Sequence, residues 1–247
     1  MKTIKGIIPP MITPLKGDDQ IDREGTVRLT EHILAGGVHA LFLLGTTGEA
    51  QSLSYECRYD FVELVCRQVA GHVPVLVGVT DTSLDESVKL AAHAAKCGAV
   101  AVVAAAPYYF APSQQELIEY YTALADALPL PLFLYNMPSH VKVFLEPATV
   151  KTLAEDPNIV GLKDSSANMT YFQTLLYHLG DREDFALYVG PEELTGESVV
   201  MGADGGVNGG ANIFPELYVQ MYYAACNHDV NTMRALQRKI MQISTSL

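Results

Sequence analysis

The chain has 247 residues, of which 49% are apolar and 18% are charged. That length fits one large domain, since α/β barrels commonly run to about 250 residues, and the apolar fraction excludes a disordered chain. Sixteen basic and 28 acidic residues give a net charge of −12. Because an acidic surface repels phosphate backbones, we expect no nucleic-acid partner.

Short apolar runs alternate with amphipathic stretches along the chain. The runs are continuous, which is typical of parallel strands covered on both faces. We predict strands at residues 6–13, 40–45, 74–79, 99–105, 131–136, 159–163, 186–190 and 205–209. We predict helices at residues 23–35, 55–69, 83–96, 113–127, 147–154, 167–179, 215–227 and 229–246.

The helix boundaries carry their own signals. Ser83 and Ser113 each stand three residues before a glutamate, which is the form of a capping box. Gly36, Gly37 and Gly98 follow helical stretches, and we expect left-handed C-caps there.

Strand–helix alternation predicts a parallel sheet, and eight units fit a closed (β/α)8 TIM barrel, an α/β fold. A doubly wound open sheet is the competing architecture, but no G-x-G-x-x-G follows an early strand. We assign residues 1–225 to the barrel catalytic domain and residues 226–247 to the start of a C-terminal helical extension. The last helix stops without a C-cap, so we expect that extension to be truncated.

The four cysteines, Cys57, Cys66, Cys97 and Cys226, form no C-x-x-C pair and no compact cluster with histidine. This spacing argues against a zinc site or a disulfide framework and favours a reducing compartment. The N-terminus lacks the features of a signal peptide, and no apolar run reaches about 18 residues. We therefore expect a cytoplasmic protein with no membrane partner.

Functional side chains of a barrel gather where its strands end. Lys163 ends the sixth predicted strand and is followed at once by Asp164. Burial lowers the pKa of a lysine, and a neutral amine can attack a ketone and form a Schiff base. The alternative is a strand-end lysine that points into solvent.

The second strand ends in Gly45-Thr46-Thr47-Gly48-Glu49. The glycines allow a tight turn, and the two threonines offer N–H groups and hydroxyls to a carboxylate. Thr46 and Glu49 also match a capping box, so a plain helix cap is the alternative.

Strands five, seven and eight end in residues with polar side chains. Tyr135 either packs or, beside a Schiff-base lysine, transfers protons to and from a substrate hydroxyl. The paired glutamates after strand seven either form a solvated loop or accept hydrogen bonds from a sugar-like substrate. The candidate substrate-binding residues at the ends of strands seven and eight are Gly190, Glu192, Glu193, Val207 and Asn208.

Tyr108, Tyr109 and Phe110 follow the fourth strand. Three adjacent aromatic residues on a loop are too many to bury locally, which suggests a subunit contact or a substrate wall.

Four segments occur in one order along nearly the whole chain: G-T-T-G-E at 45–49, P-Y-Y at 107–109, Y-N-x-P at 135–138 and G-L-K-D-S-S at 161–166. Together they resemble the dihydrodipicolinate synthase and N-acetylneuraminate lyase family, which are pyruvate-dependent class I aldolases on a (β/α)8 barrel. The resemblance implies a covalent lysine Schiff base with pyruvate, no metal and no organic cofactor.

The resemblance also implies individual roles. Lys163 would condense with the C2 ketone of pyruvate or a 2-oxo acid, and Tyr135 would be the general acid/base. Thr46 and Thr47 would bind the pyruvate carboxylate, and Thr47 would relay protons to Tyr135. Tyr109 matches a tyrosine that reaches into the neighbouring subunit's site, which implies a homotetramer built as a dimer of dimers.

One position departs from the lysine-biosynthesis members of the family. They usually carry an arginine two residues after the Y-N-x-P proline, where it helps bind the carboxylate of the semialdehyde substrate. This chain has His140 there, and a histidine cannot make a bidentate fork to a carboxylate. This departure and the glutamate pair favour a polyhydroxy 2-oxo acid.

The sequence thus predicts a Schiff-base lyase that cleaves or forms a C–C bond between pyruvate and an aldehyde. The preferred substrate is a 2-keto-3-deoxy sugar acid or a sialic-acid-like molecule. The alternatives are a 4-hydroxy-tetrahydrodipicolinate synthase, a dehydratase or hydratase-aldolase, and a non-catalytic keto-acid or sugar-acid binding protein.

Overall fold

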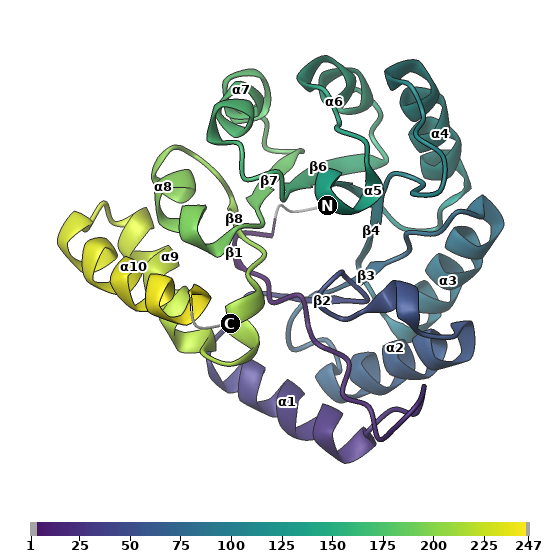
Figure 1. Cartoon of the computed structure of the whole chain (residues 1–247), viewed down its shortest axis with the longest axis horizontal. Helices are drawn as coiled ribbons and strands as arrows, with labels where there is room; N and C mark the ends of the chain where they lie inside the picture. The colour runs from purple at the N-terminus through teal and green to yellow at the C-terminus, as the bar shows by residue number, and fades with distance from the viewer. Residues whose placement is uncertain (1–3, 246–247) are drawn as a thin grey trace.

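Eight parallel strands form one sheet in the computed structural model, which describes residues 4–245 (Figure 1). Their order is β1-β8-β7-β6-β5-β4-β3-β2, so every consecutive pair from β2 to β8 is adjacent. The strands are β1 Gly6–Ile7, β2 Leu41–Leu43, β3 Val75–Gly78, β4 Ala101–Ala105, β5 Leu132–Asn136, β6 Ile159–Asp164, β7 Ala186–Val189 and β8 Gly205–Gly206.

The two ends of the sheet meet beside β1 and close the barrel. Pro10 forms an isolated parallel bridge with Phe42 of β2, and the Phe42 N–H donates to the Pro9 carbonyl at 3.0 Å. The first strand was predicted to extend to residue 13 but is only two residues long. Two consecutive prolines have no N–H to donate, so a regular ladder cannot continue through them.

Helices surround the strands, as Figure 1 shows. They are α1 Arg23–Ala35, α2 Tyr55–Val69, α3 Leu84–Cys97, α4 Gln114–Ala127, α5 Pro138–Val141, α6 Pro147–Leu153, α7 Met169–Leu179, α8 Thr195–Val200, α9 Pro215–Cys226 and α10 Val230–Ser244. Three 3-10 turns follow strands: η1 Ala50–Ser52, η2 Glu192–Leu194 and η3 Gly209–Asn212. The eight predicted helices are confirmed, except that the final predicted position, Ser246, lies outside the described residues.

The capping predictions are confirmed in part. Ser113 and Glu116 form both hydrogen bonds of a capping box, and Ser83 accepts from the Glu86 N–H. Gly98 has a left-handed φ of 94° and Gly37 one of 77°. Gly36 is right-handed, with φ −74°, which corrects its assignment as a left-handed cap, because the turn to positive φ comes one residue later.

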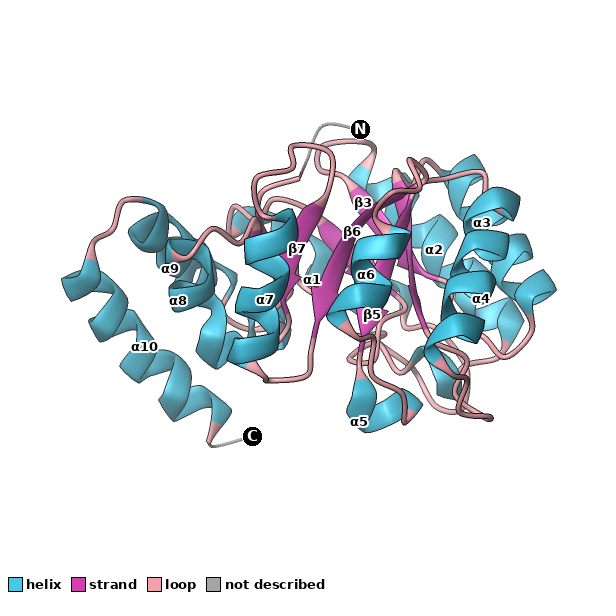
Figure 2. Cartoon of the chain, turned by 90° about the horizontal axis from the view of Figure 1, so that it is seen from above, coloured by secondary structure: helices cyan, strands magenta, loops and turns pink. Residues whose placement is uncertain are grey.

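The main core fills the barrel and the layer between strands and helices. A second buried cluster joins α8, α9 and α10 to Ile7 of β1. Figure 2 shows α10 on the outside of α9, away from the strands. α10 thus packs on α9, and the assignment of residues 226–247 to the start of an extension stays a prediction. In the described part of the chain, no helix combines the length and apolar content needed to cross a membrane.

Candidate active site

Lys163 and Tyr135 face each other from neighbouring strands. They are register partners on β6 and β5, and their side chains are 6% and 5% exposed. The Lys163 Nζ lies 4.3 Å from the centre of the Tyr135 ring and 5.3 Å from that of Phe42. The alternative of a solvent-pointing lysine is therefore wrong, and a buried amine stands beside a phenol.

The loop after β2 brings a hydroxyl to this pair. Leu44 turns the chain with a left-handed φ of 56°, a conformation that costs a non-glycine residue about 1 kcal/mol or more. Beyond it, the Thr46 Oγ1 lies 3.3 Å from the Tyr135 hydroxyl. Glu49, not Thr46, caps η1, and it does so without a side-chain hydrogen bond, so the capping-box alternative for Thr46 is wrong.

Tyr135 sits in an environment with opposing effects on its acidity. Burial raises the pKa of the phenol, but the nearby Lys163 ammonium and hydrogen bonds with Thr46, Ser165 and Lys163 outweigh it, so the pKa is lowered below its ordinary value. A phenol made more acidic by a neighbouring cation is suited to exchange protons with a substrate.

A buried polar pair lies one residue further along both strands. The Asn136 Nδ2 donates to the Asp164 Oδ1 at 2.8 Å, and both residues are 1% exposed. Asp164 also accepts from the Ser166 N–H and hydroxyl, and the Ser165 N–H donates to the Asn136 carbonyl. This pair fixes the ends of β5 and β6 and hence the relative placement of Tyr135 and Lys163.

A cavity of about 370 Å³ opens above Tyr135 and Thr46. We call it the tyrosine cavity. Its other walls come from the loops after β2, β3, β4 and β5, and include Gln51, Thr80, Tyr108 and His140. Lys163 is not among the described residues that line this cavity; it lines a separate, very small internal void with Phe42, Tyr188 and Val207.

A second cavity, of about 450 Å³, lies between the loops after β2, β7 and β8. We call it the glutamate cavity. Thr47, Gly190, Glu192 and Glu193 line it. A Cβ at Gly190 would lie 2.1 Å from the Ser165 Oγ and 3.0 Å from the Asp164 carbonyl oxygen, so a larger residue here would force Ser165 to move.

The structure separates some residues that the sequence grouped together. The Glu192 Oε2 accepts from the Gly210 N–H at 2.8 Å, while the Glu193 carboxylate accepts from the Ser244 hydroxyl on α10. Asn208 is fully buried and donates to the Thr195 Oγ1 at 2.8 Å and to the Gly190 carbonyl. Their substrate-binding roles, like that of Val207, stay predictions.

Two further predicted residues lie at the rim. His140 is exposed on α5, where its Nδ1 lies 3.0 Å from the Ser139 hydroxyl. Tyr109 is 75% exposed and packs edge-on against Phe110 at 4.9 Å. Tyr109 is not among the described residues that line the tyrosine cavity, and its role in a neighbouring subunit's site stays a prediction. The relay role of Thr47 also stays a prediction, since the threonine hydroxyl placed at Tyr135 is that of Thr46.

Sequence reasoning missed several residues of the site. Ser165 and the Asn136–Asp164 pair support Tyr135 and Lys163, and their signal was present as polar residues directly after two buried strands. Thr80 gave no such signal, because it is one polar residue among several in the loop after β3. Among residues 4–245, no group of three or more His, Cys, Asp or Glu side chains is arranged to hold a metal ion.

A closed barrel with a buried lysine and a tyrosine at the ends of adjacent strands defines a class of enzyme, the Schiff-base lyases of the class I aldolase type. Sequence comparison agrees with that class: the dihydrodipicolinate synthetase family matches residues 3–247, and the chain belongs to this family. Its members are pyruvate-dependent lyases and synthases that use a lysine–pyruvate Schiff base, and the chain is an enzyme of that type.

Three similar proteins illustrate the range of the family. The solved dihydrodipicolinate synthase from Bacteroides thetaiotaomicron is 58% identical with a TM-score of 0.96, and the match covers 99% of this chain and 82% of that one. The 4-hydroxy-tetrahydrodipicolinate synthase of Hyphomonas neptunium is 38% identical over 98% of this chain and 82% of its own length. A probable 2-dehydro-3-deoxy-D-pentonate aldolase of Escherichia coli is 35% identical over 98% of this chain and 81% of its own length.

Proposed function

We propose that this enzyme cleaves or forms a C–C bond between pyruvate and a polyhydroxy aldehyde, with a 2-keto-3-deoxy sugar acid or a sialic-acid-like molecule as substrate. The observation that carries the proposal is the placement of the buried Lys163 amine 4.3 Å from the Tyr135 ring, with the Thr46 hydroxyl 3.3 Å from the phenol oxygen. These three groups offer the nucleophile, the acid/base and a carboxylate anchor at one point.

The proposed cleavage begins when the Lys163 ammonium passes a proton to the Tyr135 phenolate and the resulting neutral amine adds to the C2 ketone. Tyr135 returns that proton to the departing water, which leaves an iminium on Lys163 and a phenolate at Tyr135. The phenolate then removes the C4 hydroxyl proton, and the C3–C4 electron pair moves into the iminium as the bond breaks. An aldehyde departs and an enamine of pyruvate stays on Lys163. Protonation at C3 and hydrolysis release pyruvate, and synthesis follows the same steps in reverse. Thr46 and Thr47 are the proposed binding groups for the pyruvate carboxylate.

The chemistry of the two cavities supports a polyhydroxy substrate. Among residues 4–245, no arginine or lysine lines the tyrosine cavity or the glutamate cavity, so the described walls offer no fixed arginine or lysine to a second carboxylate. Glu192 and Glu193 instead line the glutamate cavity, together with threonine and glycine, and one oxygen of each carboxylate is already bonded, to the Gly210 N–H and to the Ser244 hydroxyl. Carboxylates are acceptors suited to sugar hydroxyls.

The second candidate is a 4-hydroxy-tetrahydrodipicolinate synthase that condenses pyruvate with aspartate semialdehyde. The 58% identity to the dihydrodipicolinate synthase of Bacteroides thetaiotaomicron favours it, and His140 would then serve in place of the missing arginine. It requires the carboxylate of the semialdehyde to bind without a lysine or arginine from either cavity.

Two parallel assays separate the candidates. Pyruvate release is measured over a panel of 2-keto-3-deoxy sugar acids and sialic acid, and condensation is measured with pyruvate and aspartate semialdehyde. Turnover of a sugar acid without turnover of the semialdehyde is the expected result. Robust condensation with the semialdehyde alone overturns the substrate proposal, and release of water in place of an aldehyde identifies a dehydratase. Binding with neither reaction favours the non-catalytic alternative.

We also propose a cytoplasmic homotetramer, a dimer of dimers, in which Tyr109 of one copy enters the site of another. The 75% and 79% exposure of Tyr109 and Phe110 supports a subunit contact there, since such large apolar patches rarely stay uncovered. Residues 226–247 are proposed as the start of a helical extension, in line with the packing of α10 on α9.

A further inference from the structure

A buried ion pair outside the described chemistry joins two loops that wall the tyrosine cavity. Arg58 of α2 and Asp81, in the loop after β3, lie 3.4 Å apart with side chains only 8% and 7% exposed. Burying two charges costs several kcal/mol of desolvation, and the pair recovers this only through good geometry and further hydrogen bonds. Such a pair is weak evidence for a role in stability alone.

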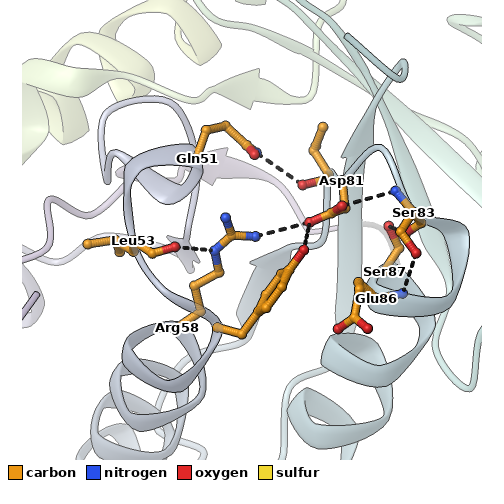
Figure 3. A network of polar contacts seen from close by, with 9 residues as sticks. Gln51, Leu53, Arg58, Asp81, Ser83, Glu86 and Ser87 are labelled. Carbon is orange, nitrogen blue, oxygen red and sulfur yellow. Dashed lines mark hydrogen bonds and ion pairs between the residues drawn. The ribbon is translucent and has the colours of Figure 1, made fainter. Parts of the chain in front are cut away.

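The further hydrogen bonds are present, as Figure 3 shows. The Arg58 Nε donates to the Leu53 carbonyl at 3.1 Å, and the Ser83 N–H donates to the Asp81 Oδ1 at 3.0 Å. The Tyr55 hydroxyl donates to the Asp81 Oδ2 at 3.1 Å, and the Arg58 guanidinium lies 4.9 Å from the Tyr55 ring centre. One charged pair thus holds the loop at residues 45–54 and the loop at residues 79–83.

From Arg58, an unbroken chain of hydrogen bonds leads to the end of β2. The Leu53 carbonyl accepts from Arg58, the Leu53 N–H donates to the Ala50 carbonyl, and the Ala50 N–H donates to the Gly45 carbonyl. Gly45 immediately precedes Thr46, whose hydroxyl contacts Tyr135. A parallel link crosses between the loops, where Gln51 donates to the Thr80 carbonyl at 3.0 Å.

The loop at residues 45–54 also contains backbone strain. Glu49 has a left-handed φ of 54°, and Leu44, at the base of the loop, has one of 56°. Non-glycine residues keep this conformation only where their surroundings enforce it. We propose that Arg58 and Asp81 are positioning residues, whose ion pair fixes the loop at residues 45–54 and thereby holds the Thr46 hydroxyl against Tyr135.

The positioning role of Arg58 and Asp81 rests on the proposed function only for its effect on catalysis. Two readouts therefore need no substrate: amide hydrogen exchange of residues 45–54, and the pH titration of Tyr135. The titration is followed by NMR of Cζ-labelled tyrosine, with the Tyr135 signal identified by its loss in Tyr135→Phe. Because Thr46 helps to lower the Tyr135 pKa, a displaced Thr46 raises it.

The test compares Arg58→Met with Lys89→Ala. Lys89 forms an exposed ion pair with Glu86 on α3, near the same loops, and serves as the matched control. In Arg58→Met we expect exchange of residues 45–54 to rise about tenfold or more, the scale of losing a hydrogen bond to a charged group. We also expect the Tyr135 titration to move towards that of Thr46→Val. Lys89→Ala leaves both unchanged.

Tyr55→Phe is the second variant, because it weakens the hold on Asp81 without leaving a buried charge unpaired. Tyr55→Phe should change the hydrogen exchange of residues 45–54 and the Tyr135 titration in the same direction as Arg58→Met, but by a smaller amount. If Arg58 and Asp81 only stabilised the fold, these variants would have a lower midpoint of thermal unfolding but an unchanged Tyr135 titration. A folded Arg58→Met or Tyr55→Phe protein with normal exchange in residues 45–54 and a normal Tyr135 titration overturns the proposal.

Discussion

Tyr135 is the residue whose surroundings are most specific to the proposed chemistry. It is 5% exposed, yet its hydroxyl meets a threonine and its ring meets an ammonium. Replacing it with phenylalanine keeps the ring beside Lys163 and removes only the proton-transfer group. We expect Tyr135→Phe to keep the borohydride-trapped pyruvate adduct but to slow turnover by about 10²-fold or more. Parallel measurement of adduct mass and kcat tests this, and full turnover in the variant contradicts it.

Thr46 offers a second test at the residue scale. Its hydrogen bond is one of the contributions that lower the Tyr135 pKa. Removing the hydroxyl in Thr46→Val should therefore raise that pKa, so the phenol ionises at a higher pH than in the parent enzyme. Tyrosine NMR across the alkaline range measures the change, with Thr174→Val, at a half-buried position of α7 outside the site, as control. An unshifted or lower titration in Thr46→Val would refute the assignment.

At the scale of elements, the ends of β5 and β6 are held together by the Asn136–Asp164 pair. Burial raises the pKa of Asp164, although hydrogen bonds from Asn136 and Ser166 act in the opposite direction. A carboxyl whose folded-state pKa lies above its unfolded value stabilises the fold most below the unfolded pKa, about 3.9, and loses that contribution as pH rises through the folded value.

The nearly isosteric Asp164→Asn variant does not titrate and so isolates this effect. We expect the stability of the parent enzyme relative to Asp164→Asn to fall as pH rises from about 3.5 to about 7. Urea denaturation at several pH values, with the difference in unfolding free energy plotted against pH, measures it. A difference that is flat or grows with pH would show that burial does not dominate at Asp164.

The elements themselves were largely predictable, and the exceptions have physical causes. Continuous apolar runs revealed all eight strands, because both faces of a barrel strand are buried. The short helices α5 and α8 were missed, since four to six residues are too few to display a helical period.

The site was predictable only to the extent that it sits at strand ends. Lys163 and Tyr135 could be paired from the sequence because parallel strands end at the same face. The different orientations of Glu192 and Glu193 could not be predicted from the sequence. They depend on contacts with Gly210 and with α10, which lie further along the chain. The buried partner of Arg58 was likewise invisible, as charge spacing does not reveal which of many acids is near.

At the scale of the whole molecule, His39 helps to close the barrel at the face opposite the site. The His39 Nδ1 accepts from the Ile7 N–H at 3.0 Å, and the backbone N–H of His39 donates to the Ile7 carbonyl at 2.9 Å. Burial lowers the pKa of His39. A base with a lowered folded-state pKa stabilises the fold above its unfolded pKa, about 6.5, and that contribution is lost as pH falls through the folded value.

We therefore expect acid to weaken barrel closure through His39. Between about pH 7.5 and about pH 5, the unfolding free energy of the parent enzyme should fall more than that of His39→Asn, whose side chain does not titrate. Urea denaturation of both proteins at the two pH values measures the difference. Equal losses in the two proteins would mean that His39 does not carry this acid sensitivity.

The central claim is that one buried amine bonds covalently to a keto acid, and it is tested most directly by trapping. The enzyme is incubated with pyruvate, reduced with borohydride, digested and analysed by peptide mass spectrometry. The account predicts one reduced pyruvate adduct, on Lys163 alone, and none in Lys163→Ala. An unmodified Lys163 peptide, or an adduct on an exposed lysine such as Lys142 in its place, would contradict it.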